Sequence, residues 1–211
     1  MVIGGRKMYI KLWQNTHFEK IDYYETIQEA VNRLISIGDA LMVIRRDGTL
    51  YNLLSQSDME FLKTYDPNKR LIEILDPTDS FLFDDDLVED ALVIMLDNRV
   101  KVLPVVDSEL YPVGTFGFFE LLKAFKTISA MDEAGTRAII KIKDEPGELN
   151  KVLSVFAQEK INVLSLMTAK ISENKRMVSL KLGIKDINKI SEILEDQEIE
   201  YEGIYEEDKS R

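Results

Sequence analysis

The spacing of hydrophobic residues changes several times along residues 17–125, and the same succession of spacings occurs twice. The first copy has an apolar run at Met42–Ile44, an Asp47–Gly48 turn and a second apolar run at Leu50–Leu54, followed by a helical pattern. Two such runs joined by a tight turn predict a β-hairpin. The second copy lies at residues 103–125, where two apolar runs flank a short polar turn. The chain is therefore predicted to contain an internal repeat.

The helix expected before each hairpin supports the repeat. Its apolar positions recur 61 residues later; they are Ile27, Ala30, Val31 and Leu34 in the first copy and Val88, Ala91, Leu92 and Met95 in the second. Residues spaced by three and four lie on one helical face. Thr26 and Glu29 have capping-box spacing, and Asp86 and Glu89 are interpreted as the matching cap. Each repeat is thus predicted to run strand, helix, strand, strand, helix.

Two registers compete within the hairpins. An offset of 60 pairs Glu60 with Glu120, whereas an offset of 62 pairs Asn52 with Gly114 and Asp58 with Glu120. We prefer 62, because it aligns the tight-turn positions and the carboxylates that begin the following helices.

A different pattern follows residue 136. Residues 138–142 read as a strand, and Asp144–Gly147 as a turn that opens a helix. The elements expected next are a strand at 163–171, a hairpin at Asn174, a strand at 177–183, a helix after Asp186 and a strand at 199–205. The order βαββαβ is that of the ferredoxin-like unit.

These patterns divide an α+β chain into six segments. We expect an N-terminal arm at 1–16, repeat one at 17–79, repeat two at 80–126, a linker at 127–136, the βαββαβ unit at 137–205 and an acidic tail at 206–211. Alternating residues at 8–13 predict an edge strand within the arm.

Charge and composition exclude several classes of function. The formal net charge is −11, and nucleic-acid binding needs a basic surface, so no nucleic-acid partner is expected. The chain has no cysteine, which excludes disulfides and thiolate metal sites. The longest apolar run, Ala91–Leu96, is too short to span a bilayer. We therefore expect a soluble cytoplasmic protein without membrane association.

Residues suited to catalysis are few. His17 is the only histidine, and a packed or surface role is preferred for it. Asp84, Asp85 and Asp86 could hold a hard metal ion, but acids at a helix start also match its dipole. No P-loop or dinucleotide-binding glycine motif is present. We expect no enzyme activity, no metal and no required cofactor; a metal-dependent enzyme using these aspartates is the third hypothesis.

Ser55 and Asp58 lie three residues apart across a strand-to-helix junction. Free N–H groups at such a junction can receive phosphates. A carboxylate there can accept two hydrogen bonds from a ribose diol, and a hydroxyl can donate to phosphate or to the diol. The alternative stays open that Ser55 simply caps the helix and Asp58 sits favourably in its first turn.

Both repeats resemble cystathionine-β-synthase (CBS) domains, which occur as tandem pairs. The resemblance covers residues 8–126 and rests on Leu103–Asp107 and on Ser55 with Asp58. It implies a cleft for AMP, ADP, ATP or a related adenosyl compound, with Asp58 on the ribose and Ser55 near it. The nucleotide-binding residues that we assign are Asn52, Ser55, Asp58, Arg99, Lys101, Gly114 and Glu120.

The repeats also depart from the CBS pattern. Asn52 stands where the family has glycine, and Val43 replaces the usual proline. In repeat two, Gly117 replaces a hydroxyl residue and Glu120 replaces the aspartate. Repeat two is therefore expected to bind more weakly or not at all. Two cations that precede the second core strand, Arg99 and Lys101, either meet phosphates or are solvated.

The βαββαβ unit resembles an ACT domain, a small regulatory module of amino-acid metabolism. The matching residues are Lys143–Leu149, followed by Asn162 before a strand. The resemblance implies either dimerisation alone or an amino-acid site at Asp144, Gly147, Glu148, Leu149 and Asn162. In such a site the early helix N–H groups would hold a carboxylate and Asp144 would accept from an ammonium.

A CBS pair followed by an ACT domain resembles the acetoin-utilisation regulatory proteins of bacteria. This resemblance implies a homodimeric, non-catalytic sensor that controls a partner enzyme. The alternative is a dimerising scaffold whose ligand sites have decayed, which Asn52, Gly117 and Glu120 favour.

Overall fold

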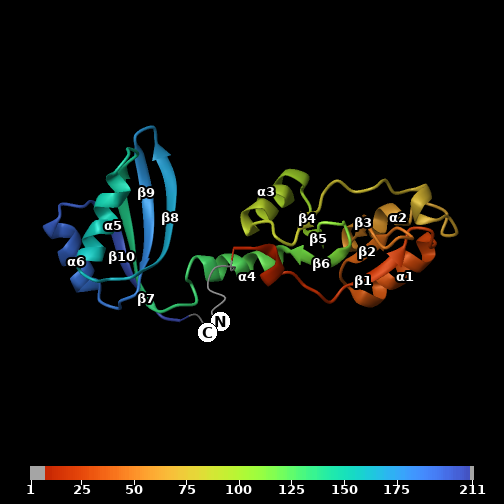
Figure 1. The fold of residues 1–211 in the computed structure, drawn as a ribbon, viewed down its shortest axis with the longest axis horizontal. Helices are drawn as coiled ribbons and strands as arrows, with labels where there is room; N and C mark the ends of the chain where they lie inside the picture. Colours follow the sequence, from red (N-terminus) through yellow and green to blue (C-terminus); the bar gives the residue numbers. More distant parts are fainter. Residues whose placement is uncertain (1–7, 210–211) are drawn as a thin grey trace. The chain divides into compact units, whose positions relative to one another are not determined.

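The computed structural model describes residues 8–209 and divides the chain into two units, Met1–Ala124 and Phe125–Arg211 (Figure 1). The outermost parts of the expected arm and tail, residues 1–7 and 210–211, lie outside the described residues.

Unit 1 contains both repeats. Repeat one comprises β1 (Glu19–Asp22), α1 (Ile27–Ile37), β2 (Leu41–Ile44), β3 (Leu50–Leu54) and the short α2 (Met59–Leu62). Repeat two comprises β4 (Leu82–Phe83), α3 (Val88–Asn98), β5 (Val102–Val106), β6 (Pro112–Gly117) and α4 (Phe118–Ile128), whose last residues belong to unit 2. The predicted succession of elements is confirmed.

The two three-stranded sheets have the same connectivity and register. In each, the first strand pairs with the second in parallel and the second with the third antiparallel, in the orders β1-β2-β3 and β4-β5-β6. Val43 lies opposite Asn52, and Val105 lies opposite Gly114. The offset of 62 within the hairpins is therefore confirmed. The helices instead keep an offset of 61, because Gly38 and Arg99 are their equivalent left-handed C-caps.

The second helix cap was assigned wrongly. Thr26 caps α1 as predicted, since its Oγ1 accepts from the Glu29 N–H at 3.2 Å. The N-cap of α3 is Leu87, whose N–H donates to Asp90 Oδ2 at 3.0 Å. Asp86 instead accepts from the Phe83 N–H at 2.8 Å and so closes the preceding turn. Asp86 therefore stabilises the loop between β4 and α3 and does not cap the helix.

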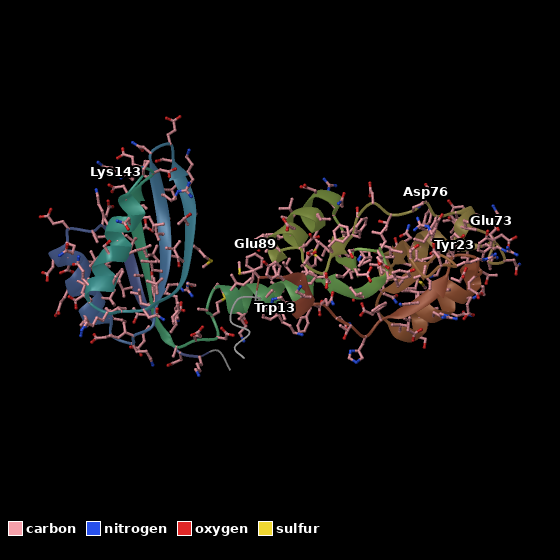
Figure 2. All side chains as sticks on the ribbon, in the orientation of Figure 1. Trp13, Tyr23, Glu73, Asp76, Glu89 and Lys143 are labelled. Atoms are coloured by element: carbon pink, nitrogen blue, oxygen red, sulfur yellow. The ribbon has the colours of Figure 1, made fainter. Side chains whose placement is uncertain are left out.

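The arm packs on repeat two, and the segment between the two repeats packs on repeat one in the same way. Its residues Ile10–Leu12 form a 3₁₀ turn, so the predicted edge strand is wrong. The Ile10 N–H donates to Asp86 O in repeat two, as the Leu71 N–H donates to Glu25 O in repeat one. Figure 2 shows Tyr23 and Glu73 together at the repeat-one end of unit 1. The segment that precedes repeat one therefore packs on repeat two, and the segment that precedes repeat two packs on repeat one.

Each repeat buries apolar residues of its own, and a small apolar cluster lies between the two. Buried residues of repeat one include Ile27, Ala30, Leu34, Leu41, Val43, Leu54 and Leu71, and those of repeat two include Val88, Ala91, Met95, Leu103, Val105 and Phe116. Met42, Leu50 and Val106 form a cluster across the two sheets. Burial of this apolar surface is the main force that fixes one repeat against the other.

Unit 2 has the βαββαβ order expected from the sequence. Its elements are β7 (Gly135–Lys143), α5 (Glu148–Gln158), β8 (Val163–Ser172), β9 (Lys175–Leu182), α6 (Ile187–Asp196) and β10 (Tyr201–Glu207). The sheet order is β10-β7-β9-β8, antiparallel throughout. Both helices pack on one face of this sheet around Phe156, Leu180 and Ile190 (Figure 1).

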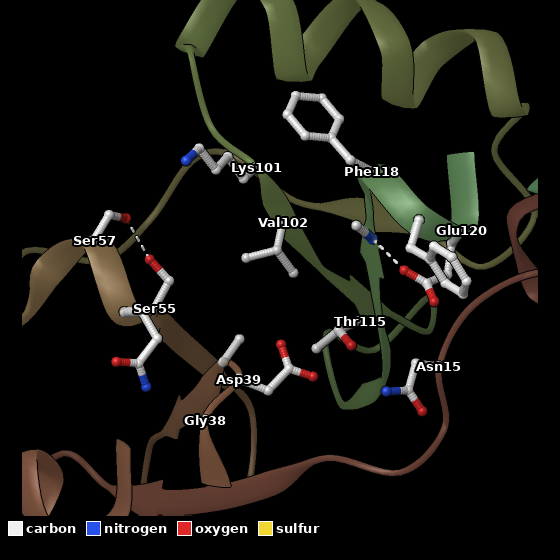
Figure 3. Close-up of a pocket in the computed structure, with 14 residues that line it drawn as sticks. Asn15, Gly38, Asp39, Ser55, Ser57, Lys101, Val102, Thr115, Phe118 and Glu120 are labelled. Carbon is white, nitrogen blue, oxygen red and sulfur yellow. Dashed lines mark hydrogen bonds between the residues drawn. The ribbon is translucent and has the colours of Figure 1, made fainter. Parts of the chain in front are cut away.

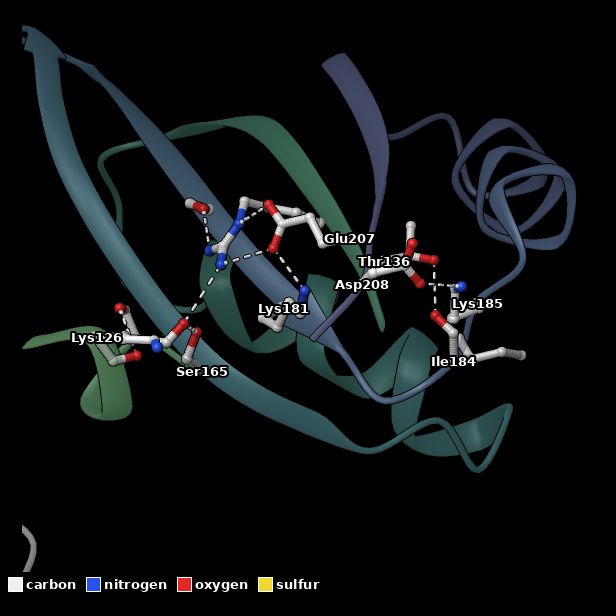
Figure 4. Close-up of polar contacts among 11 residues, drawn as sticks. Lys126, Thr136, Ser165, Lys181, Ile184, Lys185, Glu207 and Asp208 are labelled. Atoms are coloured by element: carbon white, nitrogen blue, oxygen red, sulfur yellow. Dashed lines mark hydrogen bonds and ion pairs between the residues drawn. The ribbon is translucent and has the colours of Figure 1, made fainter. Parts of the chain in front are cut away.

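The predicted acidic tail is partly structural. β10 continues to Glu207, whose carboxylate accepts from Arg137 Nε at 2.7 Å and pairs with Lys181 (Figure 4). The Lys181 side chain is fully buried, so the carboxylate neutralises a charge that would otherwise be costly. The hydrogen bond from Arg137, with a further one from Lys181, holds the pKa of Glu207 below its usual value.

Candidate functional site

Two cavities lie between the repeats of unit 1, and each takes its walls from both repeats. Cavity A has a volume of about 420 Å³. It is lined by Asn52, Leu53, Ser55, Ser57, Asp58, Thr78, Ser80, Arg99, Val100, Lys101, Val102, Leu103 and Pro104. The junction after β3 forms one wall and the segment that begins β5 forms another. Cavity A thus brings together five of the seven residues assigned to nucleotide binding.

Asp58 is the fixed carboxylate of cavity A. Its Oδ2 accepts from the Ser55 N–H at 2.7 Å and from the Ser55 hydroxyl at 2.8 Å. The Ser55 hydroxyl also lies 2.6 Å from the Ser57 hydroxyl. In the described part of the chain, no hydrogen bond reaches Asp58 Oδ1. One carboxylate oxygen is therefore held by the backbone and the other remains available to a ligand.

Two cations face cavity A from the segment between α3 and β5. Arg99 has a left-handed backbone conformation, with φ 55°, and Lys101 follows two residues later. Among residues 8–209, the side chain of neither has an ion-pair or hydrogen-bond partner. Both charges are therefore free to meet an anion, as a ligand's phosphate would require.

Cavity B is the counterpart of cavity A on repeat two and has a volume of about 590 Å³ (Figure 3). Its lining residues are Asn15, Gly38, Asp39, Ala40, Ser55, Gln56, Ser57, Lys101, Val102, Thr115, Gly117, Phe118, Phe119 and Glu120. Lys101 and Val102 line both cavities, as do Ser55 and Ser57. The two cavities therefore adjoin each other along a shared wall.

Glu120 is held in cavity B as Asp58 is held in cavity A. Its Oε2 accepts from the Gly117 N–H at 3.1 Å (Figure 3). A Cβ atom on Gly117 would lie only 3.1 Å from that same oxygen. The longer glutamate folds back onto the backbone N–H, and a side chain at position 117 would crowd its carboxylate. Gly117 and Glu120 are thus a matched pair, and the two departures from the CBS pattern compensate for each other.

Asn52 and Gly114 also differ for a local reason. The Asn52 side chain donates to Asp76 O at 2.8 Å and accepts from the Leu53 N–H, and its backbone is not left-handed. A Cβ atom on Gly114 would lie 3.0 Å from the backbone oxygen of Asn15. Gly114 therefore lies beneath the arm and lines neither cavity, whereas Asn52 fills the corresponding gap.

Several lining residues were missed by the sequence analysis, notably Asp39, Ser57, Thr78, Thr115 and Phe118. Asp39 could have been found from the repeat, because it lies in the segment that corresponds to Lys101. The segments that cross over from the other repeat carried no such signal.

Most of the residues assigned to an amino-acid site take part in contacts within unit 2. Asp144 accepts from Arg176 Nε at 3.0 Å, and this bond holds the pKa of Asp144 below its usual value. Gly147, with φ 92°, is the N-cap of α5, and Glu148 pairs with Lys151. Asn162 accepts from the Gly183 N–H through its backbone oxygen. A third cavity, of about 570 Å³, includes only Glu148 among the assigned residues.

Residues 71–127 match the family model of the CBS domain. A similar solved structure is the cytosolic domain of the Mg²⁺ channel MgtE in complex with ATP, which is 24% identical, with 56% of this chain and 49% of that one covered and a TM-score of 0.50. A CBS domain pair/ACT domain protein of Thermotoga maritima is 24% identical, with 56% and 96% covered and the same TM-score of 0.50. Unit 1 has the fold of a CBS domain pair.

Two further comparisons extend this result. A CBS domain pair in complex with 5′-methylthioadenosine and S-adenosyl-L-methionine is 19% identical, with 56% of this chain and 94% of that one covered, at a TM-score of 0.50. An inosine-5′-monophosphate dehydrogenase of Methanocaldococcus jannaschii is 23% identical over 176 residues. The chain spans about a third of that curated relative, since 34% of its length is covered.

The residues that the structure describes contain neither a cluster of metal ligands nor a helix able to cross a membrane. Between residues 8 and 209, no three acidic or histidine side chains gather where they could hold a metal ion. No helix in that range is both long enough and apolar enough to cross a bilayer.

Proposed function

We propose that the CBS pair is a sensor that binds an adenine nucleotide or a related adenosyl compound in cavity A. The observation that carries the proposal is the meeting of Asp58 with Arg99 and Lys101 around one cavity. The free oxygen of Asp58 would accept from the ribose diol. Arg99 and Lys101 would neutralise phosphates, and charge-assisted hydrogen bonds of this kind are among the strongest available to a protein.

The solved complexes support an adenosyl ligand. One similar structure holds ATP, and another holds 5′-methylthioadenosine and S-adenosyl-L-methionine. The shared fold makes an adenosyl compound the first ligand to try on this chain. The matched Gly117–Glu120 pair speaks against the alternative of a scaffold with decayed sites.

The regulatory output would pass through a homodimer to a partner enzyme. Val93, Leu96, Phe119 and Leu122 are more than half exposed on α3 and α4, which favours their burial in an assembly. Two-fold association is the commonest solution for such a face. Light scattering at micromolar concentration should give the mass of a dimer, and a monomer mass would contradict this part of the proposal.

For unit 2 we propose the role of an ACT domain, with either an amino-acid ligand or dimerisation as its contribution. A ligand's ammonium would have to displace Arg176 from Asp144. Dimerisation is supported by the long edge strand β8, where Leu166, Met167 and Ile171 are exposed.

The amino-acid role can be tested by thermal melting. If an amino acid raises the melting temperature of the wild type, Asp144→Ala should abolish the rise, while Glu145→Ala, at a neighbouring acid, should keep it. If no amino acid shifts the wild-type transition, the sensing role fails and dimerisation remains.

Nucleotide binding can be tested by calorimetry with AMP, ADP and ATP. A hydrogen bond to a charged group contributes roughly 1.5–3 kcal/mol, so Asp58→Ala should weaken binding about tenfold or more. Glu120→Ala should change binding of these nucleotides much less, because Glu120 lies in the other cavity. ATP binding should be more sensitive to salt than AMP binding, because its additional charges are screened. The absence of heat from every adenine nucleotide would refute the proposal.

A further inference from the structure

The two cavities differ in charge because of one short segment in each repeat. Gly38 and Arg99 are equivalent C-caps, and the strands that follow pair in equivalent registers. Between these fixed points repeat one has Asp39 and Ala40, and repeat two has Val100, Lys101 and Val102. Repeat one contributes this segment to cavity B alone, whereas repeat two contributes it to cavity A and, through Lys101 and Val102, to the wall that cavity B shares. An acid in cavity B thus takes the place of the cations in cavity A.

The resulting charge balance is opposite in the two cavities. Cavity A is lined by Arg99 and Lys101 with Asp58 as its carboxylate. Cavity B is lined by Asp39 and Glu120 with Lys101 as its cation. Like charges disfavour each other by Coulomb's law, more strongly where water is partly excluded. A phosphate would therefore be attracted in cavity A and opposed in cavity B.

The uncharged residues that line the two cavities also favour a cation in cavity B. Cavity B includes Phe118 and Phe119, which are 44% and 66% exposed, whereas cavity A has no aromatic lining residue. Lys123 already lies over the Phe119 ring, 4.2 Å from its centroid. The face of an aromatic ring attracts cations and packs against apolar groups. Cavity A is also lined by Thr78 and Ser80, whose hydroxyls donate to Ser80 O and Asp79 Oδ1 and would have to turn to donate to a phosphate.

We propose that this chain gives its two cavities opposite charge preferences, and that Asp39 and Glu120 set the preference of cavity B. Cavity B takes a nucleoside whose 5′ substituent carries no phosphate, and it prefers a substituent with a positive charge, while cavity A takes the phosphate-bearing nucleotide. This inference rests on the proposed binding of adenosyl ligands to the CBS pair. Glu120 would hold the ribose of the second ligand, as Asp58 holds that of the first.

The shared wall couples the two sites. Lys101 is the cation that lines both cavities. A phosphate bound in cavity A would neutralise Lys101 and so remove its repulsion of a cation in cavity B. Linkage then requires each ligand to raise the affinity of the other.

Calorimetry with two probes tests this inference. The probes are AMP and S-adenosylmethionine, whose 5′ substituent carries a sulfonium charge. We expect one of each to bind per chain at the same time, and S-adenosylmethionine to bind more tightly to AMP-saturated protein. Asp58→Asn should weaken AMP about tenfold or more and leave S-adenosylmethionine unchanged, and Glu120→Gln should do the reverse. Both substitutions preserve side-chain size, and circular dichroism verifies folding.

A charge variant distinct from the ribose contacts sharpens the test. Asp39→Asn should weaken S-adenosylmethionine up to about fivefold, the effect of a partly exposed charge pair, and leave or improve AMP binding. Glu109→Gln, at an exposed acid that lines neither cavity, should change neither. Competition between the probes for a single site, or AMP binding without S-adenosylmethionine binding, would overturn the inference and leave the proposed function standing. If neither probe binds, and ADP and ATP do not bind either, the proposed function itself fails.

Discussion

Repeat one and repeat two share a backbone plan but hold their key carboxylates with different residues. In repeat one the shorter Asp58 accepts from the N–H and the hydroxyl of Ser55. In repeat two the longer Glu120 reaches the N–H of Gly117, where a side chain would press on the carboxylate. A substitution that looks like decay in one position is therefore explained by a second, three residues away. The backbone bond, rather than the residue type, is what the two repeats preserve.

The largest effects are expected from the helix positions that the two repeats bury most completely. Leu34 and Met95 are equivalent, and both are at most 1% exposed. Leu34→Ala and Met95→Ala should each lower the free energy of unfolding by about 2–5 kcal/mol, because each leaves a cavity in the core. Chemical denaturation measures both. A loss below about 1 kcal/mol at one position alone would show that the repeats contribute unequally to the core.

The matched pair in repeat two can be broken and then restored. Gly117→Ser should cost about 1–3 kcal/mol, because its Cβ crowds the Glu120 oxygen. The double variant G117S/E120D reproduces the residues of repeat one and should recover most of that loss. Denaturant unfolding of the single and double variants measures the coupling. Additive losses would refute the compensation between these two residues.

The helix C-caps provide a smaller contrast. Gly38 and Arg99 both have left-handed backbones, with φ 70° and 55°. Gly38→Ala should destabilise the protein by about 1–2 kcal/mol, because a Cβ is disfavoured there. Arg99→Gly should relieve the same strain and stabilise by up to about 1 kcal/mol. Changes of melting temperature in opposite directions are expected, and changes of the same sign would contradict the equivalence of the caps.

The helix N-caps should show the smallest difference. Thr26 caps α1 through its hydroxyl, whereas Leu87 at the start of α3 has no side-chain acceptor. Thr26→Ala should cost about 1 kcal/mol, and Leu87→Thr should gain somewhat less, because Asp90 already satisfies the Leu87 N–H. Thermal unfolding of both variants tests this. If Leu87→Thr destabilises the protein, the packing of the leucine side chain contributes more to stability than a threonine cap would.

Local patterns predicted the elements of this fold well, and their failures share one cause. The hairpin register was predicted because Asp58 and Glu120 mark the same point in each repeat. The strand expected at residues 8–13 failed because those residues complete repeat two, a long-range contact that alternation cannot reveal. The acidic tail failed in part because Glu207 neutralises Lys181, which is distant in sequence.

The sequence by itself determined the repeat, the order of elements and the residues around Asp58, because propensity, capping and hydrophobic period act over a few neighbouring positions. Only the tertiary structure placed Arg99 and Lys101 of one repeat around the same cavity as Asp58 of the other, and Asp39 around the same cavity as Glu120. These pairings depend on how two sheets bury Met42, Leu50 and Val106 between them. The charge of each cavity is thus a property of the packed pair, since each cavity combines the carboxylate of one repeat with a segment of the other.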